Sequence, residues 1–479
     1  MMRQDSEEKD VTIEMPSGEQ ASMPRSLENL LRAPPPELNL TPKLKNLPDE
    51  IGEKFGLPTE LTVLVMAVMA STHAGGSTRL GSTGDFGLPA NLRTAVCSRG
   101  HRSLTLLFRT LGKLIFEAEG NFLNLNIRRK GKPLPDEKHL AFEKEYLETM
   151  PEERTEEFLT KAAERMHALQ RVEKPHLIFD QGSPSDLAEQ LAASADSGIL
   201  LLSDQALPLR DYLTNFSAAE RADFLTVMRR ASELSPIKTP GRRNFEWSYS
   251  ANPLASVLWV ADYPTLSAAF QDDAMTSSGF WNEFLILDVR DFPELETYRP
   301  GVTLKSLPAW QESMDRAFRT RKVGTSLITP KKEAQEEFLK FESELLELLP
   351  HLDVGLRPFV SKWLITAQKL AVNLQLASYG SGSELYPEFV ESGIALTRWL
   401  GARTLQMQRH AVRSQFQQEN IKAEQTMLMK IRDKGAVDFR TLLRSYRKQS
   451  KNLHAPVLES LLNKGLIRVG EDDLIRLAA

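Results

Sequence analysis

Five short β-like runs, interspersed with segments of helical periodicity, constrain the fold of this chain most strongly. The runs span residues 91–96, 176–179, 198–203, 256–260 and 283–287. Short apolar runs suit strands that are buried on both faces, and strands that alternate with helices favour a parallel sheet covered by helices. We therefore expect an α/β fold with a parallel sheet at its core.

Changes in composition divide the chain into five regions. Residues 1–40 are polar and end near a run of prolines, which predicts a disordered tail. We expect a helical N-terminal segment at 41–90, the sheet core at 91–292, a helical bundle at 293–422 and a separate C-terminal module at 423–479. The charged segment 132–174 has one apolar face and predicts a helical insertion in the core, whose simplest interpretation is a solvated hairpin.

Charge and cysteine content limit the environment of the protein. The net charge of −4 gives no global attraction for nucleic acid, so any DNA affinity must come from a local basic surface. The single cysteine, Cys97, excludes an internal disulfide and fits the cytoplasm. The longest apolar stretch, 61–70, is far shorter than the roughly 20 residues that cross a bilayer, and the N-terminus lacks the features of an export signal. We expect a cytoplasmic protein without membrane contact.

The segment Val96–Ser103 lies between the first strand and a helical pattern, where a phosphate-binding loop would stand. Such a loop needs glycines at its turns, a lysine on the phosphates and a hydroxyl that binds magnesium. Ser103 supplies the hydroxyl and Gly100 one flexible point, but Val96 and His101 replace glycines and Arg102 replaces the lysine. This predicts a degenerate loop, with Gly100, Arg102 and Ser103 as the nucleotide-binding candidates.

The run at 199–203 ends in Asp204 and Gln205, as a Walker B strand ends in a magnesium-binding carboxylate. Asp204 is the carboxylate candidate, although any buried parallel strand can end in aspartate. Many ATPases follow this aspartate with a glutamate that polarises water. Gln205 can orient a water molecule but cannot accept its proton, so we expect weakened catalysis.

Together these segments resemble the domain-of-unknown-function family three-nine-eight-seven, which comprises primase-helicase-like P-loop proteins of phages, plasmids and mobile elements. The resemblance covers roughly residues 40–420 and includes later segments at 255–266, 279–287 and 369–374. It implies a P-loop NTPase-like core and an arginine finger at the position of Glu283. The acidic Glu283 would oppose phosphoryl transfer. Arg290 is an alternative source of positive charge, if the register is shifted.

The C-terminal region predicts three short helices, at 425–434, 439–447 and 453–464, followed by a hairpin at 465–477. This order is typical of a winged helix, whose third helix commonly enters the major groove of DNA. A packing or protein-binding module is the alternative, because acidic residues at 459 and 471–473 dilute the charge. The DNA-binding candidates are Arg440, Arg444, Arg447, Lys448, Lys451, Asn452, His454 and Lys464.

These features predict a DNA-associated, non-catalytic P-loop NTPase-like protein of a mobile element, acting in replication, maintenance or defence. One alternative is an active ATP-dependent helicase or primase-associated ATPase, with Ser103 and Asp204 binding Mg²⁺. Another is a structural assembly subunit, a homo-oligomer or a protein-binding partner. ATP with Mg²⁺ is the candidate cofactor. The scattered histidines and the lone cysteine predict no metal site built from their side chains.

Overall fold

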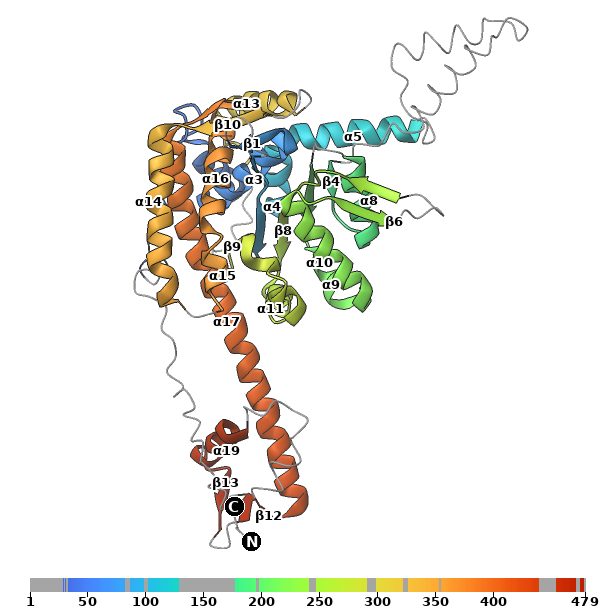
Figure 1. The fold of residues 1–479 in the computed structure, drawn as a ribbon, viewed down its shortest axis with the longest axis vertical. Coiled ribbons are helices and arrows are strands. Elements are labelled where there is room, and N and C mark those ends of the chain that lie inside the picture. Colours follow the sequence, from blue (N-terminus) through green and yellow to red (C-terminus); the bar gives the residue numbers. More distant parts are fainter. Residues whose placement is uncertain are drawn as a thin grey trace, which may run out of the picture.

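The computed structural model of the chain describes residues 29, 31, 33–81, 87–98, 102–128, 177–194, 198–240, 247–290, 299–321, 326–352, 355–438, 454–470 and 474–477. They form an α/β body and a small C-terminal module, which lies at the far end of one long helix (Figure 1). The mixed α/β class and the parallel sheet expected from the sequence are confirmed.

All five predicted strands form one parallel sheet in the order β4-β5-β8-β3-β9. Their apolar side chains are almost all buried, which explains why the sequence shows continuous runs rather than alternation. The strand of this sheet that comes first in the sequence, β3, therefore lies inside the sheet between β8 and β9. The strands are β3 (Arg93–Cys97), β4 (Ile178–Phe179), β5 (Ile199–Ser203), β8 (Ala255–Ala261) and β9 (Phe284–Asp288).

Helices connect these strands, as parallel pairing requires. Two begin with a capping box, in which Ser183 pairs with Asp186 and Ser217 with Glu220. A two-stranded hairpin of β6 (Ile237–Pro240) and β7 (Trp247–Ser250), which the sequence analysis did not predict, also belongs to this region. The helical elements are α4 (Arg102–Leu111), α5 (Lys113–Arg128), α8 (Pro184–Ala193), α9 (Leu207–Thr214), α10 (Ala218–Glu233), α11 (Tyr263–Phe270), α12 (Asp273–Ser277) and η4 (Phe280–Glu283).

The predicted N-terminal helical segment contains α2 (Leu47–Phe55) and α3 (Thr59–Ala74). Helix α3 contacts β3 and β8 on one side and two helices of the C-terminal half, α13 (Leu307–Thr320) and α16 (Trp363–Tyr379), on another. Nearly every side chain of α3 is buried for this reason. Among the described residues no single helix has the length and apolar character to span a membrane; α2 and α3 would meet the criterion only as a pair bent by 117°.

The region expected to be a helical bundle also contributes to a second sheet, in the order β11-β10-β1-β2. Its strands β1 (Thr78–Leu80) and β2 (Leu88–Pro89) come from the N-terminal segment, while β10 (Ser326–Pro330) and β11 (Glu384–Leu385) come from the supposed bundle. The region 293–422 is thus mostly helical, as expected, but it also contributes two short strands. The remaining elements there are α14 (Lys332–Leu348), η5 (Leu349–His351) and α15 (Arg357–Val360).

A single helix of 48 residues, α17 (Pro387–Lys434), runs from the body to the C-terminal module (Figure 1). The expected boundary near residue 422 falls inside this helix, so the first helix of the module is the end of α17. The part of α17 that lies in the body also forms hydrogen bonds with part of the segment that was expected to be disordered. Asn39 donates its backbone N–H to Ser392 Oγ, and the indole of Trp399 donates to the carbonyl of Ala33. Residues 33–40 therefore belong to the folded body.

Candidate functional site at the carboxyl edge of the sheet

The topology of the parallel sheet predicts a ligand-binding crevice at the carboxyl ends of β3 and β8. The chain that leaves β3 goes to β4 at one edge of the sheet, whereas the chain that leaves β8 passes to β9 on the other side of β3. In open α/β sheets, ligands bind where adjacent strands send their connections in opposite directions. The residues that follow these strands are therefore the candidate site.

The predicted phosphate loop connects β3 to α4 at this point. Ser98 directly follows β3, is buried, and donates its backbone N–H to the carbonyl of Ala261 at the end of β8. Helix α4 begins at Arg102, so Ser103 stands in its first turn, half-buried. The side chain of Arg102 and the whole of Gly100 lie outside the described residues. The strand–loop–helix order around the loop is as expected.

Asp204, which follows β5, lies beside this helix. Its Oδ2 accepts a hydrogen bond of 3.3 Å from the hydroxyl of Thr105 in the second turn of α4. Ser103 is the magnesium-binding hydroxyl that the sequence predicts, whereas Thr105 is not part of the predicted site. The two candidates stand two residues apart on one helix. The carboxylate and the loop helix are thus brought together, as expected, although through a different hydroxyl.

The turn after Asp204 has an unusual backbone. Ala206 has a φ of 47°, a left-handed conformation that costs a residue with a side chain about 1 kcal/mol or more. It is the residue before α9, and the side chain of Ser203 accepts the N–H of Leu207 across the same turn. Gln205 is exposed between Asp204 and Ala206. Backbone strain of this kind is concentrated at functional sites, and here it fixes the direction of the Asp204–Gln205 turn.

Two further aspartates follow strands at the same edge. Asp262 follows β8 and caps α11, accepting the N–H of Thr265 at 2.9 Å and an N–H of Arg210 at 3.1 Å. Hydrogen bonds from Thr265, supported by the positive charge of Arg210, hold the pKa of Asp262 below its usual range. Sequence reasoning missed Asp262, although it follows its strand just as Asp204 follows β5.

The second, Asp288, ends β9 and binds Arg290 through several hydrogen bonds, the shortest of 2.5 Å. The guanidinium of Arg290 lies 4.1 Å from the centre of the Tyr263 ring. The hydrogen bond from Arg290 to Asp288 raises the pKa of Arg290 further above its usual value. Burial, and then the charge of Asp288, raise the pKa of Cys97 to about 12, so its thiol is protonated and unreactive.

A cavity of about 450 Å³ adjoins these groups. One wall consists of the residues that follow β8 and β9, and the other wall consists of one stretch of α17. The volume lies within the usual range for small-molecule sites, and an aromatic ring beside two arginines offers both stacking and charge. The lining residues are Tyr263, Asp288, Arg290, Arg403, Gln406, Met407 and His410.

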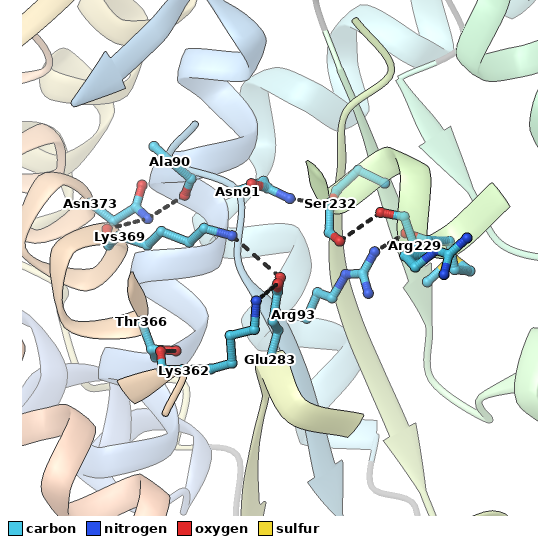
Figure 2. A network of polar contacts seen from close by, with 12 residues as sticks. Ala90, Asn91, Arg93, Arg229, Ser232, Glu283, Lys362, Thr366, Lys369 and Asn373 are labelled. Carbon is cyan, nitrogen blue, oxygen red and sulfur yellow. Dashed lines mark hydrogen bonds and ion pairs between the residues drawn. The ribbon is translucent and has the colours of Figure 1, made fainter. Parts of the chain in front are cut away.

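Glu283 lies at the opposite edge of the sheet. It directly precedes β9, whose first residue pairs with Arg93, the first residue of β3. Its carboxylate forms ion pairs with Lys369 at 3.6 Å and Lys362 at 3.8 Å (Figure 2). The structure therefore does not bring Glu283 together with Asp204 and Ser103. Arg290, in contrast, does lie at the carboxyl edge.

The C-terminal module contains α19 (His454–Asn463) and a sheet in the order β12-β14-β13, formed by β12 (Val437–Asp438), β13 (Ile467–Val469) and β14 (Leu474–Leu477). Lys464 binds the carboxylate of Glu424 in α17 at 2.7 Å. His454 begins α19, but its side chain is not described. The other DNA-binding candidates, Arg440, Arg444, Arg447, Lys448, Lys451 and Asn452, lie outside the described residues, as does the charged insertion 132–174.

Within the described ranges, no group of three or more histidine, cysteine, aspartate or glutamate side chains could hold a metal ion. No protein-family model and no curated protein matches the sequence. The resemblance to the primase-helicase-like family stays a prediction.

Proposed function

We propose that the chain is a DNA-associated, P-loop NTPase-like protein that binds a nucleotide at the carboxyl edge of its sheet without efficient hydrolysis. The observation that carries the proposal is the strand order. The strand before the candidate loop, β3, is separated by β8 from β5, which ends at Asp204. The same order, with one strand between the phosphate-loop strand and the Walker B strand, is typical of a large class of P-loop ATPases, an argument from likeness of fold.

The described residues at this edge fit ATP and Mg²⁺. Magnesium prefers oxygen ligands, and the Asp204 carboxylate accepts a hydrogen bond from the hydroxyl of Thr105 in α4, the helix whose first turn carries Ser103. Phosphates favour the N-terminal end of a helix, where backbone N–H groups are unpaired. Bound magnesium would neutralise charge on the phosphates, while the cavity beside Tyr263 and Arg290 provides a place for the rest of the nucleotide.

Weak hydrolysis follows from the residues that surround the site. Gln205 can orient a water molecule but accepts no proton from it. The two other strand-end carboxylates at this edge, Asp262 and Asp288, are each bound to an arginine. Arg102 and His101 depart from the lysine and glycine of a working loop. Glu283 adds nothing to this argument, because it lies at the other edge.

The C-terminal module supports DNA association. The described elements follow the order of a winged helix: the end of α17, then β12, α19 and the hairpin of β13 and β14. Strand β12 pairs with β14, as the first and last strands do in that fold. Six of the eight DNA-binding candidates carry a positive charge between residues 440 and 464. A role in the replication, maintenance or defence of a mobile element, in the cytoplasm, follows from the family resemblance and from the single buried cysteine.

Two measurements test the proposal. The purified chain is assayed for ATP turnover with and without DNA, beside Arg102→Ala and Asp204→Ala variants; we expect no turnover above background. ATP turnover by the wild type that both variants abolish would establish the active ATPase instead. The position of Arg290 at the carboxyl edge, where it offers positive charge, is the observation that favours this alternative.

DNA affinity is measured as a function of salt. We expect the affinity to fall as salt rises, and an Arg440→Ala/Arg444→Ala variant to have a shallower salt dependence, while the body control Arg319→Ala/Lys332→Ala leaves it unchanged. No DNA affinity, with self-association that salt does not weaken, would instead support the assembly subunit. The Lys464–Glu424 pair is the observation that favours this alternative, since it engages one candidate DNA contact within the protein.

A further inference from the structure

A second, smaller cavity lies at the amino-terminal edge of the sheet, about 200 Å³ in volume. It is separated from the nucleotide edge by the length of β3, roughly 13 Å for five residues. Its walls come from the C-terminal half of α10, from the segment that contains η4, and from the starts of β3 and α16. Its lining residues are Arg93, Leu225, Thr226, Arg229, Ser232, Glu233, Ser278, Gly279, Phe280, Asn282, Glu283 and Lys362.

One wall of this cavity is a buried arginine. The side chain of Arg93 is only 4% exposed, and it donates one terminal N–H to the carbonyl of Met228. Its Nε is buried and has no hydrogen-bond acceptor among the described residues. Burial lowers the pKa of Arg93, and the negative charges of Glu283 and Glu233 oppose this shift. Arg93 thus combines an unused N–H donor with a position in the wall of the cavity.

Positive charge exceeds negative charge around the cavity. Four cations, Arg93, Arg229, Lys362 and Lys369, accompany two carboxylates, Glu233 and Glu283. Glu283 is shared between the two lysines, both of which reach it from the same side in Figure 2. It leaves Arg93 and Arg229 without a carboxylate within ion-pair distance among the described residues. The six groups together carry a net charge of +2, which is equal and opposite to the charge of a phosphate dianion.

From this arrangement, we infer that the cavity is an oxyanion site that binds a phosphate group. A guanidinium donates in a planar fork that matches phosphate oxygens, and the exposed Arg229 also lines the cavity, so two guanidinium groups are available to one anion. The hydroxyl of Thr226 and the amide of Asn282 add polar groups to the wall. The volume lies below the usual range for small-molecule pockets, so the site fits inorganic phosphate or one phosphate of a small ester rather than a whole nucleotide.

The test uses the full chain and inorganic phosphate, with thermal unfolding and calorimetric titration as readouts and chloride at equal ionic strength as the reference. We expect phosphate to bind and stabilise the chain more than chloride does. Arg229→Gln, at an exposed position, should weaken phosphate binding at least tenfold. Arg230→Gln is the matched control, because the neighbouring Arg230 guanidinium binds the carbonyl of Pro236 and does not line the cavity.

A second variant changes the affinity in the opposite direction. Glu233→Gln removes an exposed negative charge from the cavity and should tighten phosphate binding. A chain that phosphate stabilises no more than chloride, or identical titrations for Arg229→Gln and Arg230→Gln, would overturn the inference. Asp204→Asn separates the two sites, since it should weaken ATP binding at the carboxyl edge and leave phosphate binding here unchanged. Loss of phosphate binding in Asp204→Asn would show that phosphate binds at the nucleotide edge instead.

Discussion

The hydroxyl oxygen of Thr404 in α17 accepts the backbone N–H of Ile286 in β9 at 2.8 Å. Since β9 is an edge strand, its outward N–H groups need partners other than a neighbouring strand. Thr404 provides one, and also donates its own proton to the carbonyl of Leu400. The long helix is therefore fixed to the sheet beside the candidate nucleotide cavity, and the same helix carries the C-terminal module.

Replacing Thr404 by valine should destabilise the body. Valine has nearly the same shape but accepts no hydrogen bond, so the buried N–H of Ile286 would lose its partner. We expect the free energy of unfolding to fall by about 1–3 kcal/mol in urea denaturation. Thr404→Ser keeps the acceptor and should cost clearly less; equal losses for the two variants would show that the methyl group matters and the hydrogen bond does not.

Gly401 is a second requirement of the long helix. A Cβ at this position would lie 2.5 Å from the indole of Trp363, so the close approach of α16 and α17 depends on the missing side chain. Gly401→Ala should lower the free energy of unfolding by about 1–3 kcal/mol through overpacking, even though alanine is the better helix former. Gly301→Ala, where a Cβ meets no atom within 4 Å, is the control and should be near neutral.

Stability should depend on pH through His73. This ring is fully buried in α3, with Nδ1 2.6 Å from the carbonyl of Met69, and Arg321 nearby adds positive charge. Burial lowers the pKa of His73 from 6.5 to about 4. Between pH 6.5 and pH 4 the imidazole is protonated in the unfolded chain but neutral in the folded chain. The contribution of neutral His73 to the free energy of unfolding is therefore fully present above pH 6.5 and is lost as the pH falls toward 4.

The size of this effect is at most about 3 kcal/mol. Urea denaturation at pH 7 and at pH 5 measures the change in the free energy of unfolding. The His73→Gln variant should show most of this pH difference removed. An unchanged pH dependence in His73→Gln would assign the effect to other groups.

Cys97 offers a simple probe of the core. Its side chain is buried at the end of β3, and its raised pKa keeps the thiol protonated at neutral pH. We expect a colorimetric thiol reagent to react slowly with the native chain at pH 8 and to titrate one thiol in urea. Rapid reaction of the native protein would mean that the carboxyl end of β3 is open to solvent.

The strands of the main sheet were predictable, because runs such as 199–203 are continuous and apolar and are separated by helical patterns. The second sheet was not, since its strands are two to five residues long and β10 pairs with β1 across more than 240 residues. The length of α17 was underestimated because the winged-helix pattern predicts a separate short helix at 425–434 and therefore a domain boundary near residue 422. No proline or glycine interrupts residues 402–434, which is the physical reason that the helix continues.

The site was predictable in part for a related reason. Asp204 and the loop were identified because each follows a β-like run in the pattern of a known nucleotide site. Asp262 could have been found from the rule that parallel strands bring their carboxyl ends to one edge. Thr105 depends on the rotation of α4, which the pattern does not specify. The grouping of Arg93, Lys369 and Glu283 joins three distant segments and leaves no local signal. Glu283 was misplaced relative to the nucleotide because it comes before its strand rather than after it.

Equilibrium binding of Mg²⁺-ATP, followed by calorimetry, tests the central claim most directly. The account predicts that the wild-type chain binds Mg²⁺-ATP, that Asp204→Asn weakens binding at least tenfold, and that Thr105→Val weakens it while Thr105→Ser does not. Asp223→Asn, an exposed aspartate on α10, is the matched control and should bind as the wild type does. Absence of binding by the wild type, or equal affinities for Asp204→Asn and Asp223→Asn, would contradict a nucleotide site at this edge of the sheet.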